Sequence, residues 1–581
     1  MPFYPKLSGR GSTRIVTDTF GGYNHNLKIR DGDFYDTENM SLQHYPMLSN
    51  RPRRGRLERT FTNLQAIIAK DALYWVDNGT LYANGYETGL TGLQTQRPTQ
   101  LVSMGAYICI FPDKKYINTQ DLTDFGSMGA EYSYEGTVTY TMCHSDGTYY
   151  TDVSTSADPP EDPENGAIWI DADGSAHEYS VTTETWTVLE TVYTRIDFTT
   201  MGQLPRLFRE QDGVNIRGTY SEDLDGSKIL YAVGSDEDTQ QDYIVVVGIT
   251  SEQIIEQNSV TITRRVPDMD YVCEAQNRLW GCFYGNDGTQ NINEIYCCAL
   301  GDFRNWEQYL GISTDSWRAS RGSDGPWTGC INYLGTPTFF KENVIHPVSV
   351  STQGAHQIGD IPARGVQLGS HRSLAIVNET LYYKSRTGVM AYQGGMPTDV
   401  AQALGEEKYY DAAAGVFGQN YYISMKDAAG AWHFFCFDAG KGLWIHEDDL
   451  HVEGFAQVGD ELFALADNGV TAINGTTGAL EDDFEWSCTT GLLTYEYPDR
   501  KYLSRFNIRV NMSFESGFQM FIEYDSSGVW NYAGDFHLPT TGTVTIPLRP
   551  RRCDHMRLRF KGKGDVRFYS IARVLERGSD V

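Results

Sequence analysis

Three stretches of the sequence contain residue types that could bind a metal ion. Segments 171–174 and 223–226 each read Asp-x-Asp-Gly, as a calcium loop begins, but neither has a Glu six residues after its glycine. His446 and His451 are five residues apart, whereas a zinc-binding helix presents two histidines four apart on one face. Turns explain the Asp-Gly pairs and a polar loop explains the histidines, so the sequence predicts no metal site.

The motifs of the common enzyme classes are missing from the chain. It contains neither the phosphate-binding pattern G-x-x-x-x-G-K-[ST] nor the nucleophile pattern G-x-S-x-G. A carboxylate pair for glycoside hydrolysis stays open in a chain with 76 Asp and Glu, but no pair stands out. The sequence therefore predicts that the protein is not an enzyme and has no catalytic residue and no cofactor.

Arginines form two basic groups in an acidic protein. Arg forks pair with carboxylates in two parallel hydrogen bonds, which suits docking to a neighbouring copy or an acidic partner. The alternative is an ordinary solvated strand face, which is the better explanation for the group at 549–563. The candidate subunit-docking residues are Arg51, Arg53, Arg54, Arg56 and Arg59.

Composition points to a globular β protein. The chain of 581 residues has 47 Lys and Arg against 76 Asp and Glu, a net charge of −29, which excludes an ordinary nucleic-acid reader. It contains 58 Gly and 37 Tyr, which favours strands with many tight turns over helices. Residues 1–12 lack the apolar stretch of a secretory signal, and no apolar run approaches the ~20 residues of a membrane-spanning helix. The ten cysteines include no C-x-x-C pair, so we expect reduced thiols in a protein made in a cytoplasm.

Short hairpin units recur along the chain. Asn78-Gly79 separates two strand-like runs and predicts a type I′ turn. Equivalent aromatic positions Phe340, Tyr382, Tyr422 and Phe463 are 42, 40 and 41 residues apart, which is the period of a propeller blade. Trp306 and Trp444 each follow an Asp turn, where a Trp can fill the gap between neighbouring blades. A plain stack of antiparallel meanders would give a similar spacing.

The sequence thus predicts a mainly β chain: a β-propeller of short antiparallel blades with an inserted small β module and a C-terminal β-sandwich. The one helix candidate is 398–404, with Thr398 as its N-cap. The N-terminal segment offers few residues for a core, so we expect it to lie on its own domain or on a neighbouring subunit. The predicted domains are an extended arm at 1–60, first blades at 61–125, an acidic inserted β module at 126–260, remaining blades at 261–478 and the sandwich at 479–581.

Three motifs in this order resemble a family, the tail nozzle (tail tubular protein B type) proteins of short-tailed bacteriophages and prophages. The first is the arm, with Gly21-Gly22-Tyr23-Asn24, then Glu38-Asn39-Met40, Pro46 and the Arg-rich turn at 51–55. The second is the stretch 323–329 together with 339–343, which is similar to their propeller blades. The third is the insertion from Pro160 to Trp169, with Tyr179 and Trp186 downstream. The long acidic insertion and the added sandwich depart from the family pattern, which leaves the position along the tail open.

The resemblance implies a structural virion protein of the tail, assembled with copies of itself into a ring that is a hexamer in nozzles. Such a ring would extend the portal and adaptor channel for DNA ejection and anchor tail fibre or tip proteins. Viral DNA would only pass through, without sequence-specific binding. An acidic wall suits that passage, because it repels phosphate and the polymer slides rather than sticks.

Two other functions stay open: a head-associated stabilising protein that clamps capsid or portal, and a glycan-binding or glycan-cleaving propeller. The charge is unevenly spread, at +2 for 1–125, −20 for 126–260, −11 for 261–478 and 0 for 479–581. We therefore expect the insertion to face a DNA path or open solvent rather than a subunit interface.

Overall fold

The computed structural model describes residues 12–577 except 97, 251, 287, 351–354, 468, 496–499, 539 and 550. Residues 1–11 of the predicted arm therefore lie outside the described residues. The chain divides into two compact units. The first contains Met1–Glu87, Thr338–His346 and Gly359–Val581, and the second contains Thr88–Pro337 and Pro347–Ile358.

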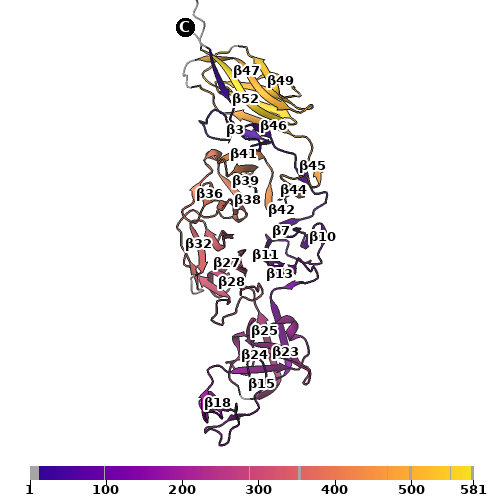
Figure 1. The fold of residues 1–581 in the computed structure, drawn as a ribbon, viewed down its shortest axis with the longest axis vertical. Coiled ribbons are helices and arrows are strands. Elements are labelled where there is room, and N and C mark those ends of the chain that lie inside the picture. Colours follow the sequence, from indigo (N-terminus) through magenta and orange to yellow (C-terminus); the bar gives the residue numbers. More distant parts are fainter. Residues whose placement is uncertain are drawn as a thin grey trace, which may run out of the picture. The chain divides into compact units, whose positions relative to one another are not determined.

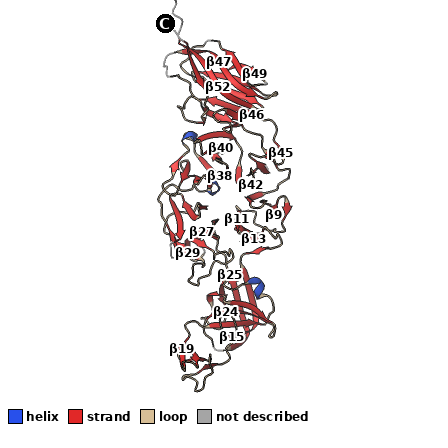
Figure 2. Ribbon diagram, viewed as in Figure 1, coloured by secondary structure: helices blue, strands red, loops and turns tan. Residues whose placement is uncertain are grey.

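The described residues are almost entirely β-strands and turns (Figure 2), and the predicted fold class is confirmed. Seven small sheets have the strand order and length of propeller blades. In the first unit they are β7 (Leu64–Ala69), β8 (Leu73–Asp77), β9 (Thr80–Ala83) and β10 (Tyr86–Glu87); β34 (Ala375–Val377), β35 (Thr380–Lys384), β36 (Val389–Tyr392) and β37 (Thr398–Asp399); β38 (Tyr409–Phe417), β39 (Asn420–Asp427), β40 (Trp432–Asp438) and β41 (Leu443–Asp448); and β42 (Val452–Val458), β43 (Glu461–Ala466) and β44 (Gly469–Ala472) with β6 (Gly55–Arg56) and β45 (Ala479–Leu480).

Two further blades belong to the second unit, and the residues of a last one are divided between the units. The two are β11 (Gln100–Met104), β12 (Tyr107–Phe111), β13 (Lys115–Asn118) and β14 (Phe125–Ser127); and β26 (Tyr271–Ala275), β27 (Arg278–Asn286), β28 (Asn291–Cys297) and β29 (Trp317–Ser320). The divided sheet is β30 (Gly329–Tyr333), β31 (Thr336–Lys341), β32 (Val344–Val350) and β33 (His356–Ile358).

The turn and repeat predictions are confirmed. Asn78 and Gly79 have φ angles of 48° and 75°, and the hairpin pairs Asp77 with Thr80, as a type I′ turn requires. The four aromatic repeat positions lie on β31, β35, β39 and β43, each the second strand of its sheet. A period of about 40 residues therefore marks one blade, because each blade reuses the same buried strand.

Tryptophans fill the space between neighbouring blades, as predicted. Trp444 on β41 is 1% exposed, and its Nε1 donates to the carbonyl of Val400, just after β37 of the adjacent blade, at 2.8 Å. In the second unit, buried Trp306 shares a core cluster with Phe111 of one blade and Leu279 of the next. Blade-to-blade packing thus depends on a few large rings.

The N-terminal segment is built into the first unit through strand pairing (Figure 1). Strand β6 completes a blade by pairing antiparallel with β44. Strands β2 (Gly22–Tyr23) and β3 (Asp33–Glu38) join β41 to β46 (Glu485–Thr490), so one continuous sheet runs from a blade into the C-terminal region. Phe34 and Met40 are 2% and 0% exposed, so the expectation that this segment adds little to a core is wrong.

The C-terminal strands form two sheets around that same core, as a β-sandwich does. Strand β46 continues through β51 (Met556–Lys563), β48 (Gly517–Tyr524) and β49 (Trp530–Phe536). The second sheet contains β4 (Met40–Ser41), β5 (Leu48–Asn50), β52 (Val566–Arg577), β47 (Lys501–Met512) and β50 (Gly542–Pro547), with β1 (Ser12–Thr17) on β52. Alternate residues of β47, such as Phe506 and Ile508, are buried, as its period-2 pattern predicts.

The acidic insertion folds around its own apolar core in the second unit. Its large sheet has the order β22 (Gly226–Ile229), β21 (Gly213–Arg217), β25 (Gln253–Arg264), β15 (Ala130–Cys143), β20 (Tyr193–Phe198), β24 (Gln241–Val247) and β23 (Ala232–Asp236). A second sheet contains β16 (Val153–Thr155), β17 (Ile168–Ile170), β18 (Ala176–Ser180) and β19 (Thr185–Val188).

Helical structure among the described residues is limited to α1 (Leu204–Leu207) and two 3-10 turns, η1 (His371–Ser373) and η2 (Gln402–Leu404). The helix predicted at 398–404 is wrong, because Thr398 lies on β37 and the N-cap of η2 is Ala401. In the described part of the chain, no helix combines the length and the apolar character needed to cross a membrane.

Candidate functional site

Two of the predicted docking arginines are buried inside the first unit. Arg51 is 5% exposed; its Nε donates to Asn39 Oδ1 at 2.8 Å, and its guanidinium binds the carboxylate of Glu481. The same guanidinium lies 3.3 Å from Asp448 and 4.1 Å from the ring centroid of Phe484. The guanidinium of Arg51 therefore pairs with carboxylates of its own chain.

Arg54 is the centre of this cluster. It is 4% exposed and pairs with Glu447 at 2.7 Å and Asp448 at 2.6 Å, both on β41. Burial opposes ionisation, but Arg54 and Arg51 hold the pKa of Asp448 below its usual range. Burial raises the pKa of Glu447 despite the same partners. The cluster joins the arm to the blade.

The other three arginines are more accessible. Arg53 is 46% exposed and lies 3.3 Å from Asp483. Arg56 is exposed on β6, and Arg59 donates to the carbonyl of Gly85 at 2.6 Å and stacks over Tyr82. The prediction that Arg51 and Arg54 dock to another copy is wrong, because intrachain carboxylates hold them; docking by Arg53, Arg56 and Arg59 stays a prediction.

The metal-like motifs have other roles in the structure. Asp171 accepts from the backbone N–H groups of Asp173 and Ser175, both at 2.9 Å, and pairs with His177. Asp225 accepts from Thr219 N–H at 2.9 Å, so both Asp-Gly segments organise turns. His446 lies on strand β41, which corrects the polar loop expected there. In the described parts of the chain, no group of three or more His, Cys, Asp or Glu side chains is arranged to hold a metal ion.

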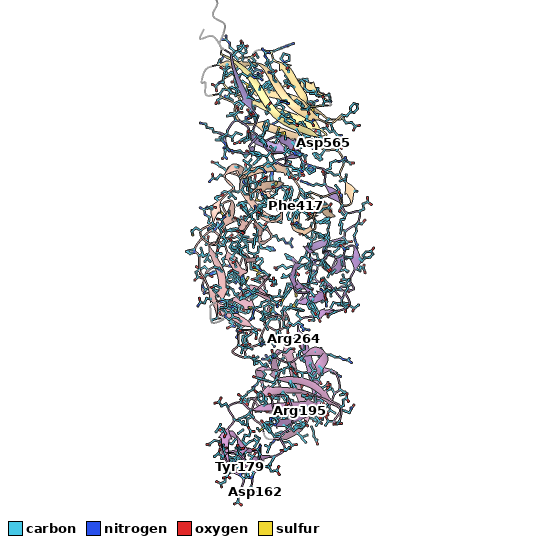
Figure 3. All side chains as sticks on the ribbon, in the orientation of Figure 1. Asp162, Tyr179, Arg195, Arg264, Phe417 and Asp565 are labelled. Atoms are coloured by element: carbon cyan, nitrogen blue, oxygen red, sulfur yellow. The ribbon has the colours of Figure 1, made fainter. Side chains whose placement is uncertain are left out.

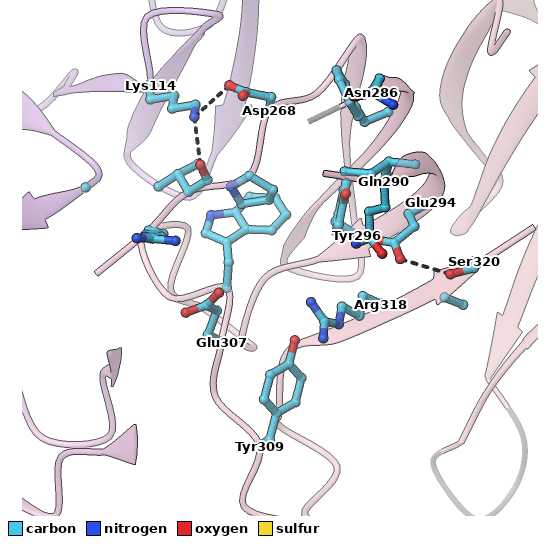
Figure 4. Close-up of a pocket in the computed structure, with 18 of the residues that line it drawn as sticks. Lys114, Asp268, Asn286, Gln290, Glu294, Tyr296, Glu307, Tyr309, Arg318 and Ser320 are labelled. Atoms are coloured by element: carbon cyan, nitrogen blue, oxygen red, sulfur yellow. Dashed lines mark hydrogen bonds and ion pairs between the residues drawn. The ribbon is translucent and has the colours of Figure 1, made fainter. Parts of the chain in front are cut away.

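The second unit contains a pocket of about 930 Å³, a size in the usual range for small-molecule sites (Figure 4). It lies beside β28 and β29, the loop that precedes that blade and the connection between these two strands. Charged and aromatic residues share its lining. They include Lys114, Asp268, Glu294, Tyr296, Glu307, Tyr309 and Arg318.

Glu307 is a partly buried acid in this pocket. Its Oε2 is buried and has no hydrogen-bond partner. Burial raises the pKa of Glu307, while Arg265 and Arg318 act in the opposite direction. A carboxyl in this state holds its proton to higher pH than a solvated Glu, as a general acid must.

Two tyrosines and a second carboxylate complete the chemical character of the pocket. Glu294 accepts from Ser320 Oγ at 2.9 Å, and burial raises the pKa of the neighbouring Tyr296. Tyr309 is 46% exposed, so its ring is open to a ligand; burial of its hydroxyl raises the pKa of Tyr309, and Arg318 acts in the opposite direction. The pocket therefore offers carboxyl groups, guanidinium groups and aromatic surface.

Residues that line this pocket are fixed in place by hydrogen bonds and an ion pair within the protein. Lys114 donates to the carbonyl of Val266 at 2.7 Å and pairs with Asp268 at 2.8 Å. Trp306 is 4% exposed, and its Nε1 donates to the carbonyl of Phe303 at 2.8 Å. The loop that presents Glu307 is thus anchored by the residue before it.

Sequence reasoning missed Glu294 and Glu307. They are two among 76 acids and stand in no motif. The one available signal was Trp306, which the sequence singled out as a blade filler and which directly precedes Glu307. Burial of a carboxylate is a tertiary property, so the acid itself could not be selected.

A scan against protein-family models found no match, and a search of curated proteins found none. Among solved structures, the chain is similar to an exo-β-1,3-galactanase from Phanerochaete chrysosporium with galactose, at 8% identity and a TM-score of 0.22 over 52% of this chain and 94% of that one. It is also similar to a glycoside hydrolase family 43 arabinoxylan arabinofuranohydrolase from Bacillus subtilis in complex with cellotetraose, at 8% identity and a TM-score of 0.18 over the same shares.

These neighbours contradict one prediction. Both are glycoside hydrolases, so the prediction that the chain is not an enzyme is withdrawn. TM-scores this low transfer neither an activity nor a substrate to this chain.

Proposed function

We propose that the chain binds a glycan in the pocket of its second unit. The observation that carries this proposal is the buried, unpartnered Oε2 of Glu307 in a pocket that also offers the open ring of Tyr309. Sugar rings present apolar C–H faces to aromatic rings and hydroxyl edges to carboxylates and guanidinium groups. Both kinds of surface line this pocket.

The same pocket could support cleavage of the bound glycan. Glycoside hydrolysis uses one protonated carboxyl to donate to the leaving oxygen and a second carboxylate as base or nucleophile. Glu307 is the acid in this proposal, because burial favours its protonated form. Glu294, on β28, is the second carboxylate.

We expect Glu307→Gln to lower any hydrolysis of a bound neutral oligosaccharide by about 100-fold or more, because the amide keeps the shape but cannot donate a proton in this way. The acid is protonated below its folded-state pKa, so wild-type cleavage should fall as pH rises through that raised value. Reducing-end release from a panel of neutral oligosaccharides, measured from pH 4 to 8, checks both expectations.

Two variants separate binding from cleavage. Tyr309→Ala should weaken oligosaccharide binding, measured by calorimetry, about tenfold, since it removes an exposed aromatic surface. Glu252→Gln, at an exposed acid outside the pocket, is the matched control and should change neither property. Absence of both binding and hydrolysis across the panel would refute the glycan function.

A second candidate function is a tail component of a bacteriophage virion. The observation that favours it is that the arm motifs behind the resemblance contribute to β2 and β3, which join a blade to the sandwich, and to β6, which completes another blade. On this proposal the protein is made in the host cytoplasm, joins copies of itself in a ring and contacts portal, adaptor and fibre or tip proteins. A tail part that also binds a glycan would satisfy both candidates.

Assembly tests this second candidate. We expect the purified chain to sediment as a multimer, or to join one when portal and adaptor proteins are added, and electron microscopy would give its symmetry. Attachment to capsid or portal in place of a tail ring would favour the head-associated alternative. A chain that stays monomeric in the presence of portal and adaptor proteins would defeat the ring.

A further inference from the structure

The small sheet β16–β19 in the inserted module has two unlike faces. Ile168, Ile170 and Ala176 are buried on one face, where they pack with Met142 and Val192. Because side chains alternate along a strand, the residues between them point to the opposite face. That second face carries aromatic residues, where an ordinary half-buried sheet carries polar ones.

Strand register places these aromatic residues together. Trp169 on β17 stands opposite His177 on β18, and Tyr179 on β18 stands opposite Trp186 on β19. The Trp169 and Trp186 ring centroids are 5.7 Å apart, and those of Tyr179 and Trp186 are 5.2 Å apart. We call these four residues the aromatic face; Figure 3 labels Tyr179 on it.

The rings of the aromatic face are packed against one another but remain accessible. All four side chains are partly exposed, and Val188 at the end of β19 is 56% exposed. Trp169 Nε1 donates to the carbonyl of Ser156 at 2.9 Å, and its ring stacks on His177 at 4.8 Å. His177 in turn pairs with Asp171 at 2.9 Å, so a hydrogen-bonding pair borders the rings. These contacts fix the ring positions before any ligand arrives.

The charge around the aromatic face restricts its partner. Residues 150–190 contain ten Asp and Glu and no Lys or Arg. That charge repels nucleic acids, anionic membranes and acidic glycans. The strands are only three to five residues long, so the face is small beside the ~800 Å² per partner of a stable protein interface.

We propose that the aromatic face binds a neutral glycan. A pyranose ring is about the size of one aromatic ring, and its C–H face can lie on Trp169 or Trp186 while its hydroxyls reach the His177–Asp171 pair and the surrounding carboxylates. A neutral sugar pays no electrostatic penalty beside ten acids. This site is separate from the Glu307 pocket and does not depend on it.

Binding of the full chain to insoluble cellulose, chitin and β-1,3-glucan, measured by sedimentation with the polysaccharide, tests this proposal. We expect Trp186→Ala and Trp169→Ala each to weaken the binding at least tenfold, and 0.5 M NaCl to leave it unchanged. Trp186→Phe keeps a ring and should retain most of the binding. Retained binding by Trp186→Phe would show that the alanine variants lose the ring contact with the glycan rather than the fold of the β16–β19 sheet. Melting temperatures equal to that of the wild type would confirm that the variants are folded.

Three further variants serve as controls for this site. Glu307→Gln and Tyr309→Ala alter only the pocket and should leave polysaccharide binding at the aromatic face intact, while Trp530→Ala in the sandwich controls for loss of a partly exposed Trp. Failure of the wild-type chain to bind any of the three polysaccharides would overturn the proposal. Polysaccharide binding that the Trp variants leave unchanged would also overturn it. The same holds if the chain binds none of the polysaccharides but binds a cationic protein such as lysozyme, in an interaction that salt abolishes.

Discussion

Arg54→Ala is expected to lower the free energy of unfolding of the first unit by about 3–5 kcal/mol. Arg54 is 4% exposed and is the shared partner of Glu447 and Asp448, so its loss leaves the buried Glu447 without its ion-pair partner and Asp448 with Arg51 alone. Removing one partner of a buried ion pair lowers the free energy of unfolding by far more than the intact pair contributes to it, because the remaining charge stays buried. Guanidinium denaturation followed by tryptophan fluorescence would measure this loss.

The pH dependence of that loss gives a second readout. The pKa of Asp448 is held below its ordinary value of 3.8, so its pairing stabilises the fold above that value and is lost as pH falls through the lowered pKa. In the variant, protonation removes the uncompensated charges of both carboxyls. The difference between wild type and variant should therefore shrink as pH falls below about 4.

Arg53→Ala is the matched control, because Arg53 directly precedes Arg54 in the sequence but is 46% exposed in its pair with Asp483. An exposed pair contributes about 0–1 kcal/mol, so this variant should unfold almost as the wild type does. Equal losses for Arg53→Ala and Arg54→Ala would contradict the assigned role of the buried cluster.

Trp444→Ala is expected to destabilise the first unit by a similar amount, about 3–5 kcal/mol. The side chain is 1% exposed, packs against Phe435 and Phe437 and donates its Nε1 hydrogen to Val400 of the neighbouring blade at 2.8 Å. Its removal opens a cavity between two blades and leaves a partly buried carbonyl without its donor. Thermal melting and hydrogen exchange of β37 and β41 would register the loss.

Trp444→Phe divides this effect into its parts. Phe restores much of the ring volume but not the hydrogen bond, so it should recover most of the stability. Trp530→Ala removes a Trp that is only half buried on the edge strand β49 and should cost clearly less. The role of Trp444 as a blade filler would be disproved by a Trp444→Ala variant as stable as Trp530→Ala.

The sequence was most informative where a property is local or periodic. Asn78-Gly79 predicts its turn because the two φ angles are a matter of backbone sterics alone. The aromatic spacing predicts blades because every blade buries the same strand, and the alternation in β47 predicts which side chains are inside. The fold class therefore followed from the sequence, as did the place of Trp444.

Tertiary structure alone decided which charged residues are partners. Arg51 and Arg54 look like exposed docking residues in sequence, yet their carboxylates, at 447, 448 and 481, come from segments almost 400 residues or more away. Glu307 likewise is one acid among 76 until folding removes water from its Oε2. Turn geometry and periodicity depend on residues that are near one another in the sequence, so they could be predicted here. Ion pairing and desolvation depend on which distant segments meet in the folded chain, so they could not.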